Sequence, residues 1–371
     1  MRGGVLYDSG TTPGPNRYAV RRPTMIAGTA EAKGWTKLLA WFGAPLVIMV
    51  ITLGAYFWST GNPQKPASPP ERVIIAEATA PGAGPVYVAA AKGYFAAEGV
   101  DVVLQAHASG KTAVHSVLEG NADMGTAGET PIMFAVMQGG KVSVLATVNT
   151  SEKGTMIIAR KDRGISKPGE LKGKQIGVTS GTTGQFFLDL FLISHRVPRE
   201  DIHVVNLKPE EMFDGLMQGD VDAVSTGRNP HTYPLQKALA DRGVTFYGEG
   251  IYNEMFNIVA AQAFVKEKPE AVRRVLRALV TATKFMAQNA DESNRIIADK
   301  LEMDKSVISE LWNTYNFAVT LDQSLLTTFE DQARWAIRNK LTDQSEVPNY
   351  LDFIYLDGLK AVRPEGVTII H

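Results

Sequence analysis

The sequence predicts an α/β protein made of two similar units, with mostly parallel sheets flanked by helices and one transmembrane helix in front of them. Three observations support this prediction: an uncharged apolar run near the N-terminus, an order of strands and helices that occurs twice, and a short motif that ends both occurrences. The chain has 371 residues. This is longer than a domain with a single hydrophobic core usually is. Two compact units with appendages are therefore expected.

The composition excludes several classes of function. Lys and Arg number 38 and Asp and Glu number 39, scattered along the chain without the basic stripe that binds nucleic acid. The absence of cysteine excludes disulfides, thiolate metal sites, cysteine nucleophiles and lipid attachment to cysteine. The six histidines lack H-E-x-x-H or other ligand spacing, and no G-x-S-x-G elbow occurs. We therefore expect no metal, no cofactor and no enzymatic activity.

The run from Leu39 to Trp58 contains no charged residue. A helix of about 20 residues spans a hydrocarbon core of roughly 30 Å. Basic residues such as Arg21, Arg22 and Lys37 all precede the run, so the N-terminus is expected in the cytoplasm. A cleaved signal peptide is the alternative, but its apolar region is typically about 7–15 residues and ends near small residues. We predict a single-pass anchor over residues 35–58 in the inner or cytoplasmic membrane and a disordered cytoplasmic tail over residues 1–34.

The segment after the predicted anchor, residues 59–71, is rich in proline, with Pro63, Pro66, Pro69 and Pro70. Such a composition favours an extended, semi-rigid chain. We interpret this segment as a linker that holds the following domain away from the bilayer.

From Val73 onward the apolar pattern predicts alternating strands and helices, in the order strand, loop, helix, strand, helix, strand. The strands of the first unit are expected at 73–76, 100–104 and 122–126, and its helices at 86–97 and 111–118. The same order returns with strands at 175–178, 202–207 and 221–226, and helices at 185–195 and 209–217. Alternation of this kind favours mostly parallel, helix-covered sheets. Beyond Lys266 the periodicity becomes helical, and we expect these helices to pack on the first unit.

Both units end in the motif G-x2-D-x4-G-x2-P. Its paired residues are Gly120 and Gly219, Asp123 and Asp222, Gly128 and Gly227, and Pro131 and Pro230. The first glycine suits a left-handed helix end, the aspartate begins a buried strand, and the last glycine and proline shape the turn that leaves the strand. A packing turn that is used twice by chance is the alternative. The matching order of elements before each motif favours a true structural repeat.

Ligands of open α/β sheets bind outside the carboxyl ends of the strands, and four loops at such ends supply candidate residues. The loop before the helix at 185–195 offers hydroxyls and backbone N–H groups to an anion, although capping of that helix is an alternative reading. The candidate ligand-binding residues are Thr79, Pro81, Gly82, Gly128, Glu129, Thr130, Ser180, Gly181, Thr182, Thr183, Arg228 and Asn229.

Glu129 and Arg228 occupy the same position of the repeat and carry opposite charges. If the two units face each other across a cleft, the two side chains are expected to oppose each other and to attract more strongly as the cleft closes. Alternatively, Arg228 holds a sulfonate or carboxylate and Glu129 holds an ammonium group of one zwitterion. Two solvated rim charges, worth less than about 1 kcal/mol, are the third possibility.

Several short motifs together resemble the nitrate, sulfonate, taurine and thiamine-precursor solute-binding family of ABC importers, over roughly residues 72–371. The motifs are Ala89–Phe95 with Gly99-Val100, Gly120–Asp123, Gly128–Pro131, Leu171–Lys174 before Ile176–Val178, Gly219–Ala223 and Lys360–Pro364. The resemblance implies a two-lobed type II periplasmic-binding fold. It places lobe one at 72–160 and 249–371 and lobe two at 161–248, with crossings near Met156–Ala159 and Phe256–Ala260.

The resemblance also implies a function. A protein of this family captures a small anionic or zwitterionic solute by closure of its two lobes, in the periplasm or outside the cell, and delivers it to an ABC permease in the membrane. The partners would be the solute, the permease and, through the N-terminal helix, the lipid bilayer. A tethered sensor or partner-docking subunit is an alternative. An enzyme of the thiamine-pyrimidine synthase type is another, but that group carries a cysteine-rich motif that this chain lacks.

Overall fold

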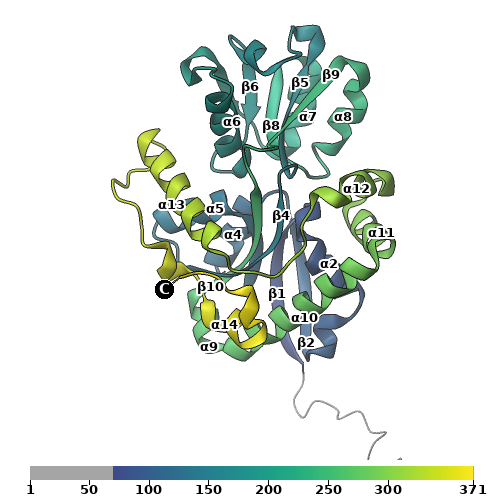
Figure 1. The fold of residues 1–371 in the computed structure, drawn as a ribbon, viewed down its shortest axis with the longest axis vertical. Helices are drawn as coiled ribbons and strands as arrows, with labels where there is room; N and C mark the ends of the chain where they lie inside the picture. The colour runs from purple at the N-terminus through teal and green to yellow at the C-terminus, as the bar shows by residue number, and fades with distance from the viewer. Residues whose placement is uncertain (1–69, 371) are drawn as a thin grey trace, which may run out of the picture. The chain divides into compact units, whose positions relative to one another are not determined.

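The computed structural model describes residues 70–370, which form two α/β lobes (Figure 1). The predicted tail and anchor and nearly all of the predicted linker lie outside the described residues. Among residues 70–370, every helix is too short or too polar to cross a membrane.

The first lobe is built on a five-stranded sheet in the order β2-β1-β3-β10-β4. Its strands are β1 (Glu71–Ala78), β2 (Val100–His107), β3 (Met124–Gly128), β4 (Val142–Ser151) and β10 (Glu254–Ala261). Strand β1 is parallel to β2 and β3, whereas β10 is antiparallel to β3 and β4. The expectation of mostly parallel sheets was therefore wrong. The sheet is mixed because β10 brings the chain back from the other lobe and runs away from the cleft.

The second lobe repeats this arrangement in a sheet of order β7-β6-β8-β5-β9. Its strands are β5 (Thr155–Arg160), β6 (Gln175–Val178), β7 (His203–Asn206), β8 (Ala223–Gly227) and β9 (Gly243–Tyr247). Strand β6 is parallel to β7 and β8, and β5 is antiparallel to β8 and β9. The two sheets thus share strand order and direction, which makes the sequence repeat a structural one.

The aspartate of the repeated motif has the same role in both lobes. The Asp123 carboxylate accepts a hydrogen bond from the backbone N–H of Ile74 at 2.8 Å, and Asp222 accepts one from Gln175 at 2.9 Å. Each aspartate therefore ties the start of the third strand to the first strand of its unit. The glycines three residues earlier both adopt left-handed backbones, with φ of +75° and +89°, as the motif predicted.

The chain crosses between the lobes at residues 152–154, after β4, and at residues 248–253, before β10. Both crossings lie a few residues earlier than expected, because Met156–Ala159 and Phe256–Ala260 pair within β5 and β10. Strand β5, which we assigned to lobe one, belongs to the sheet of lobe two. The apolar runs form buried strand interiors, and the polar stretches before them make the connections.

Thirteen helices cover the sheets within the described residues. Those of the first lobe are α2 (Gly84–Ala91), α3 (Tyr94–Ala97), α4 (Gly110–Leu118), α5 (Glu129–Met137), α9 (Gln262–Glu267), α10 (Pro269–Gln288), α11 (Ala290–Leu301), α12 (Lys305–Leu311), α13 (Gln323–Arg338) and α14 (Leu356–Val362). Those of the second lobe are α6 (Thr183–Ser194), α7 (Met212–Gln218) and α8 (Tyr233–Leu239). The C-terminal helices return to the core of the first lobe, as predicted. Helix α10 starts at Pro269 and buries Val272, Val275 and Leu279, one face of a 3.6-residue period.

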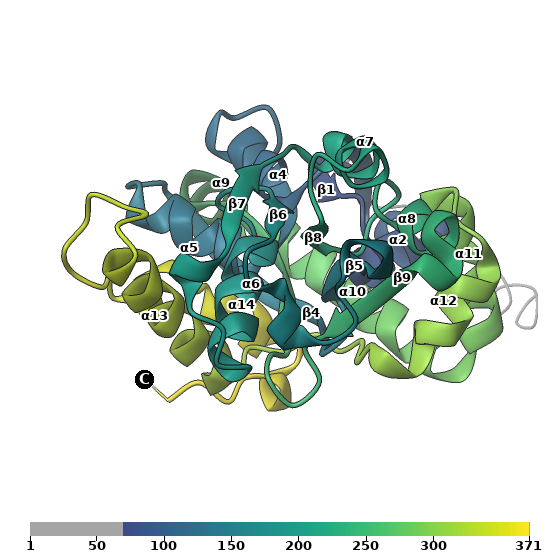
Figure 2. The same ribbon diagram turned by 90° about the horizontal axis from the view of Figure 1, so that it is seen from above.

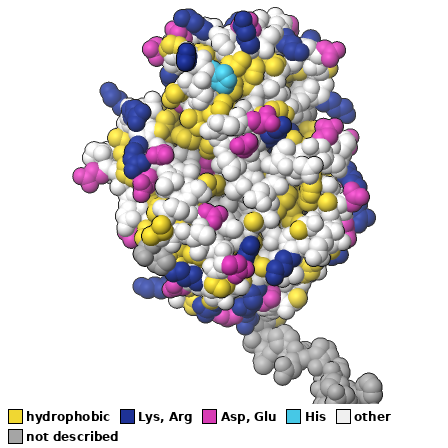
Figure 3. Space-filling model, viewed as in Figure 1, with side chains coloured by type: hydrophobic (Ala, Val, Ile, Leu, Met, Phe, Trp, Pro, Cys, Tyr) yellow, Lys and Arg dark blue, Asp and Glu magenta, His cyan; other side chains and the backbone are white. Residues whose placement is uncertain are grey.

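The second lobe has a core on each face of its sheet. Ile157 packs with Phe187 of α6, whereas its neighbour Ile158 packs with Leu216 of α7 and Leu235 of α8. Successive residues of a strand point to opposite faces, so α6 covers one face and α7 with α8 covers the other (Figure 2). On the outer face shown in Figure 3, acidic and basic side chains are interspersed over both lobes.

Candidate functional site

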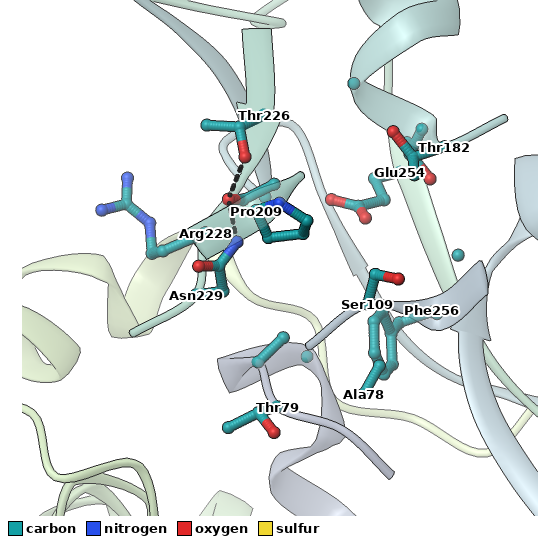
Figure 4. A pocket seen from close by; sticks show the side chains of 18 of the residues that line it. Ala78, Thr79, Ser109, Thr182, Pro209, Thr226, Arg228, Asn229, Glu254 and Phe256 are labelled. Carbon is teal, nitrogen blue, oxygen red and sulfur yellow. Dashed lines mark hydrogen bonds between the residues drawn. The ribbon is translucent and has the colours of Figure 1, made fainter. Parts of the chain in front are cut away.

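A cavity of about 90 Å³ lies between the two lobes (Figure 4). Its lining comes from loops at the carboxyl ends of strands in both sheets, from the first crossing, from the start of β10 and from the segment after α12. The residues used below are Thr79, Ser109, Gly128, Asn149, Gly154, Thr182, Thr183, Arg228, Asn229, Glu254, Phe256 and Tyr315. The volume corresponds to roughly six to nine water molecules at about 10–15 Å³ each, which suits a solute of a few heavy atoms.

Three helices begin at this cavity. The first residues of α4, α5 and α6 are preceded by Ser109, Gly128 and Thr182, all of which line it. Helix N-termini present free N–H groups and about half a positive charge. The Ser109 hydroxyl accepts a hydrogen bond from the N–H of Thr112 at 3.3 Å and so caps α4. The Thr182 hydroxyl instead donates to the Thr179 carbonyl at 2.7 Å. Thr182 therefore does not cap α6 with its side chain, and the capping alternative does not account for a hydroxyl at this position.

The structure brings together most of the predicted site residues but not all. Those that line the cavity are Thr79, Pro81, Gly82, Gly128, Thr182, Thr183, Arg228 and Asn229. Ser180 and Gly181 line a second hollow beside Lys111, whose amino group donates to the Ser180 carbonyl at 3.0 Å. Ligand contact by any of these residues stays a prediction.

Glu129 is fully buried and is not part of the cavity lining. Its carboxylate accepts hydrogen bonds from the Tyr252 hydroxyl, from the Gln332 amide at 3.1 Å and from the Met255 N–H at 3.1 Å. Burial, followed by the nearby charge of Glu254, raises the pKa of Glu129 to about 8. The expectation that Glu129 opposes Arg228 is therefore wrong in this structure, because the repeat fixes backbone positions but not the direction of each side chain.

Arg228 is 4% exposed and lies in the wall of the cavity formed by the second lobe. Its Nη1 donates to the Gln236 side chain at 3.3 Å and its Nη2 to the Tyr247 hydroxyl at 3.5 Å. Its Nε is buried and has no hydrogen-bond partner within residues 70–370. In Figure 4 the guanidinium extends away from Glu254. Arg228 thus adds positive charge to the wall.

Asn229 is oriented by its own turn. Its side-chain amide donates to the Gly227 carbonyl at 3.1 Å, and its side-chain oxygen accepts from the N–H of His231 at 2.9 Å. The loop after β8 is therefore held by local hydrogen bonds, which fixes the position of this part of the wall.

Sequence reasoning missed Glu254, Asn149, Phe256 and Tyr315. Glu254 opens β10, and the Thr155 hydroxyl donates to its carboxylate at 2.9 Å. Burial raises the pKa of Glu254 to about 7 and that of Tyr315 to about 12. The buried Oδ1 of Asn149 has no hydrogen-bond partner among the described residues. The polar residue at the start of the predicted crossing strand was a usable signal for Glu254, whereas no local pattern marks Tyr315.

Within residues 70–370 no cluster of three or more His, Asp or Glu side chains has the arrangement of a metal site. The donors that line the cavity are hydroxyls, amides and backbone N–H groups, together with one guanidinium. Such a set suits an anion or a hydrogen-bonding solute.

Comparison with known proteins agrees with this geometry. The family described as NMT1/THI5 like matches residues 80–293, more than half of the chain. The taurine-binding periplasmic protein of Escherichia coli (strain K12) is 28% identical over 226 residues, which cover 60% of this chain and 69% of that protein.

Two solved structures show the fold. The alkanesulfonate-binding protein SsuA from Xanthomonas axonopodis pv. citri, bound to MOPS, has a TM-score of 0.67 at 17% identity and covers 78% of this chain and 99% of that one. The periplasmic nitrate-binding protein NrtA from Synechocystis PCC 6803 has a TM-score of 0.65 at 17% identity, with coverage of 80% and 89%. The resemblance found in the sequence is confirmed: the chain belongs to the NMT1/THI5-like family, and it is similar to a taurine-binding protein in sequence and to alkanesulfonate- and nitrate-binding proteins in fold.

Proposed function

We propose that this protein is an extracytoplasmic solute-binding protein that captures a small anionic or zwitterionic solute between its lobes and delivers it to an ABC permease. The cavity between the lobes supports this proposal most strongly. Three helix N-termini and threonine hydroxyls meet there around a volume of about 90 Å³, and Arg228 lies in the wall. Sulfonates, taurine and nitrate are the solute classes that this lining and the similar binding proteins favour.

Binding and closure are one process in this proposal. Both lobes contribute to the lining of the cavity. A solute that contacts both lobes binds the closed arrangement more tightly than the open one, and this difference in affinity shifts the protein toward closure. The protein acts by binding alone, without catalysis, as do the binding proteins to which it is similar.

The same proposal includes the tether. A single span at residues 35–58 would hold the two lobes at the outer surface of the inner or cytoplasmic membrane, within reach of the permease. The proline-rich residues 59–71 would set the distance.

A thermal-shift screen of the full chain tests the binding proposal. Taurine, ethanesulfonate, β-alanine, propionate and nitrate are each added in excess, because a ligand of the folded state raises the melting temperature by mass action. We expect at least one solute to raise it. Arg228→Ala should weaken binding of that solute at least tenfold, whereas Arg242→Ala, at an exposed arginine of the same lobe, should leave binding unchanged. A folded protein that responds to none of these solutes would contradict the proposal.

A further inference from the structure

Among residues 70–370, one carboxylate lines the cavity. Glu254 begins β10 directly after the second crossing, and its side chain is directed toward the space between the lobes (Figure 4). The Thr155 hydroxyl, at the start of β5, orients it by donating to Oε2 at 2.9 Å. The carboxylate therefore sits where the two crossing segments lie next to each other, in contact with both lobes.

Two glycines make room for this side chain. A Cβ atom added to Gly154 would overlap Oε2 of Glu254, and one added to Gly128 would lie 3.4 Å from Oε1. Both glycines also line the cavity. The backbone thus approaches the carboxylate closely and confines it to one position.

Among residues 70–370, no cationic side chain forms an ion pair with this carboxylate. Within these residues its one side-chain hydrogen bond comes from Thr155. Arg228, the arginine of the cavity wall, donates instead to Gln236 and Tyr247. Besides burial, the charge of Glu254 raises the pKa of the Glu129 carboxyl and of the Tyr315 hydroxyl, and neither of these groups brings a positive charge.

A purely structural role does not require a carboxylate here. The hydrogen bond from Thr155 would form equally well to the amide oxygen of a glutamine. Removing a carboxylate from water without a partner is unfavourable, and burial accordingly raises the pKa of Glu254 to about 7. A charged group that the fold destabilises, inside a binding cavity, indicates a role in recognition.

We propose that Glu254 is the specificity-determining residue of the cleft and selects solutes whose cationic, N–H-donating end, such as a primary ammonium, pairs with its carboxylate. This inference rests on the proposed function. The anionic end of such a zwitterion lies among the helix N-termini, near Thr182 and Thr183, so aminoalkanesulfonates and short amino acids are favoured over solutes that lack the amino group. A charge-assisted hydrogen bond of this kind is about twice as strong as a neutral one.

Binding of the ammonium group is linked to a proton. Below about pH 7 the Glu254 carboxyl of the free protein is protonated, and an ammonium ligand displaces that proton because it stabilises the charged form. Affinity for an amino-bearing solute should therefore rise with pH up to about 7 and level off above it. The Glu129 carboxyl is absent from the cavity lining, because it is held by Tyr252, Gln332 and Met255. Tyr315 does line the cavity, but burial raises the pKa of its hydroxyl to about 12, so it stays neutral over this pH range.

Isothermal titration of the full chain with matched pairs of solutes tests the proposal. Taurine is compared with ethanesulfonate, and β-alanine with propionate, since the members of each pair differ by the amino group. We expect wild type to bind the amino-bearing member of at least one pair tenfold or more tighter. Glu254→Gln, which keeps the shape of the side chain, should reduce this ratio to about one. Glu152→Gln, at an exposed glutamate of the first crossing, should keep it.

A second measurement does not depend on the variant. At pH 6, titrations of wild type in buffers of different ionisation enthalpy should show release of up to one proton on binding of the amino-bearing solute and none for its partner. Equal affinities within both pairs, a preference that survives Glu254→Gln, or binding without proton release would overturn the proposal. Binding of nitrate alone would overturn it while leaving the proposed function intact, and a protein that binds no solute at all would remove the proposed function itself.

Discussion

Buried polar side chains next to the crossings set the character of the site at the residue scale. Glu129 opens α5 but turns away from the cavity, toward Tyr252 of the second crossing and Gln332 of α13. One carboxyl thus joins α5, α13 and the segment that returns from the second lobe. Three donors favour its charged form, but the effect of burial is larger and raises its pKa to about 8.

Glu129 should make the stability of the protein fall as pH rises. The unfolded chain ionises this carboxyl near pH 4.5, whereas the folded protein holds the proton up to about pH 8. The contribution of Glu129 to the free energy of unfolding is therefore fully present below pH 4.5 and is lost as the pH rises from 4.5 to 8. Glu129→Gln should flatten the decline of the melting temperature over this range, measured by calorimetry. Glu152→Gln should retain the decline of wild type, and an unchanged slope in Glu129→Gln would contradict this assignment.

The contact between α6 and α13 joins the lobes at the scale of elements. The indole N–H of Trp335 on α13 donates to the Asp189 carboxylate on α6 at 2.9 Å, and the rings of Trp335 and Phe186 meet edge to face at 5.1 Å. Helix α6 also begins at the cavity, at Thr182 and Thr183. The helix that supplies a cavity wall is therefore held by the other lobe through Phe186 and Asp189 of its first two turns.

Loss of the Trp335 hydrogen bond should favour the open arrangement of the lobes. A hydrogen bond to a charged group contributes about 1.5–3 kcal/mol, and Arg199 continues to pair with Asp189 at 2.8 Å. We expect Trp335→Phe to weaken solute binding about tenfold to a hundredfold, because the closed state is less populated, without a change in the preference between solutes. Titration calorimetry measures both quantities. The ring of Trp312 contacts Phe317 within the first lobe, so Trp312→Phe should bind solute like wild type. Equal affinities for wild type and both variants would exclude a role of Trp335 in closure.

The elements that the sequence predicted are those governed by local rules. Asp123 and Asp222 were found because a glycine, an aspartate and a buried strand follow one another at fixed spacing, and their hydrogen bonds to Ile74 and Gln175 match. Tyr315 and Trp335 were not found, since their partners are distant in sequence and come together only by packing of the lobes. The pairing of Glu129 with Arg228 failed for the same reason: neighbouring elements, not the repeat, decide where each side chain points.

At the scale of the whole molecule, the two crossings are short and lie next to each other, at residues 152–154 and 248–253. The Gly248 N–H donates to the Glu152 carbonyl at 3.1 Å, and Lys153 pairs with Glu249 at 2.8 Å, which connects the crossings directly. The hydrogen bond from Thr155 to Glu254 lies just beyond them. Lobes joined in this way can move as rigid bodies about the crossings, and a solute that contacts both linings of the cavity shifts the population toward closure. Solute-driven closure is the central claim of the proposed function.

Because the chain has no cysteine, a pair of introduced cysteines reports closure directly. The cysteines replace two exposed residues, Lys266 of the first lobe and Glu200 of the second. One is labelled with a donor dye and the other with an acceptor dye. Energy transfer between the dyes is followed while the full chain is titrated with taurine, ethanesulfonate and nitrate. We predict a saturable change in transfer efficiency with at least one of these solutes, at the concentration that raises the melting temperature, and its loss in Arg228→Ala. Transfer that stays constant while a solute binds would contradict closure, and with it the central claim.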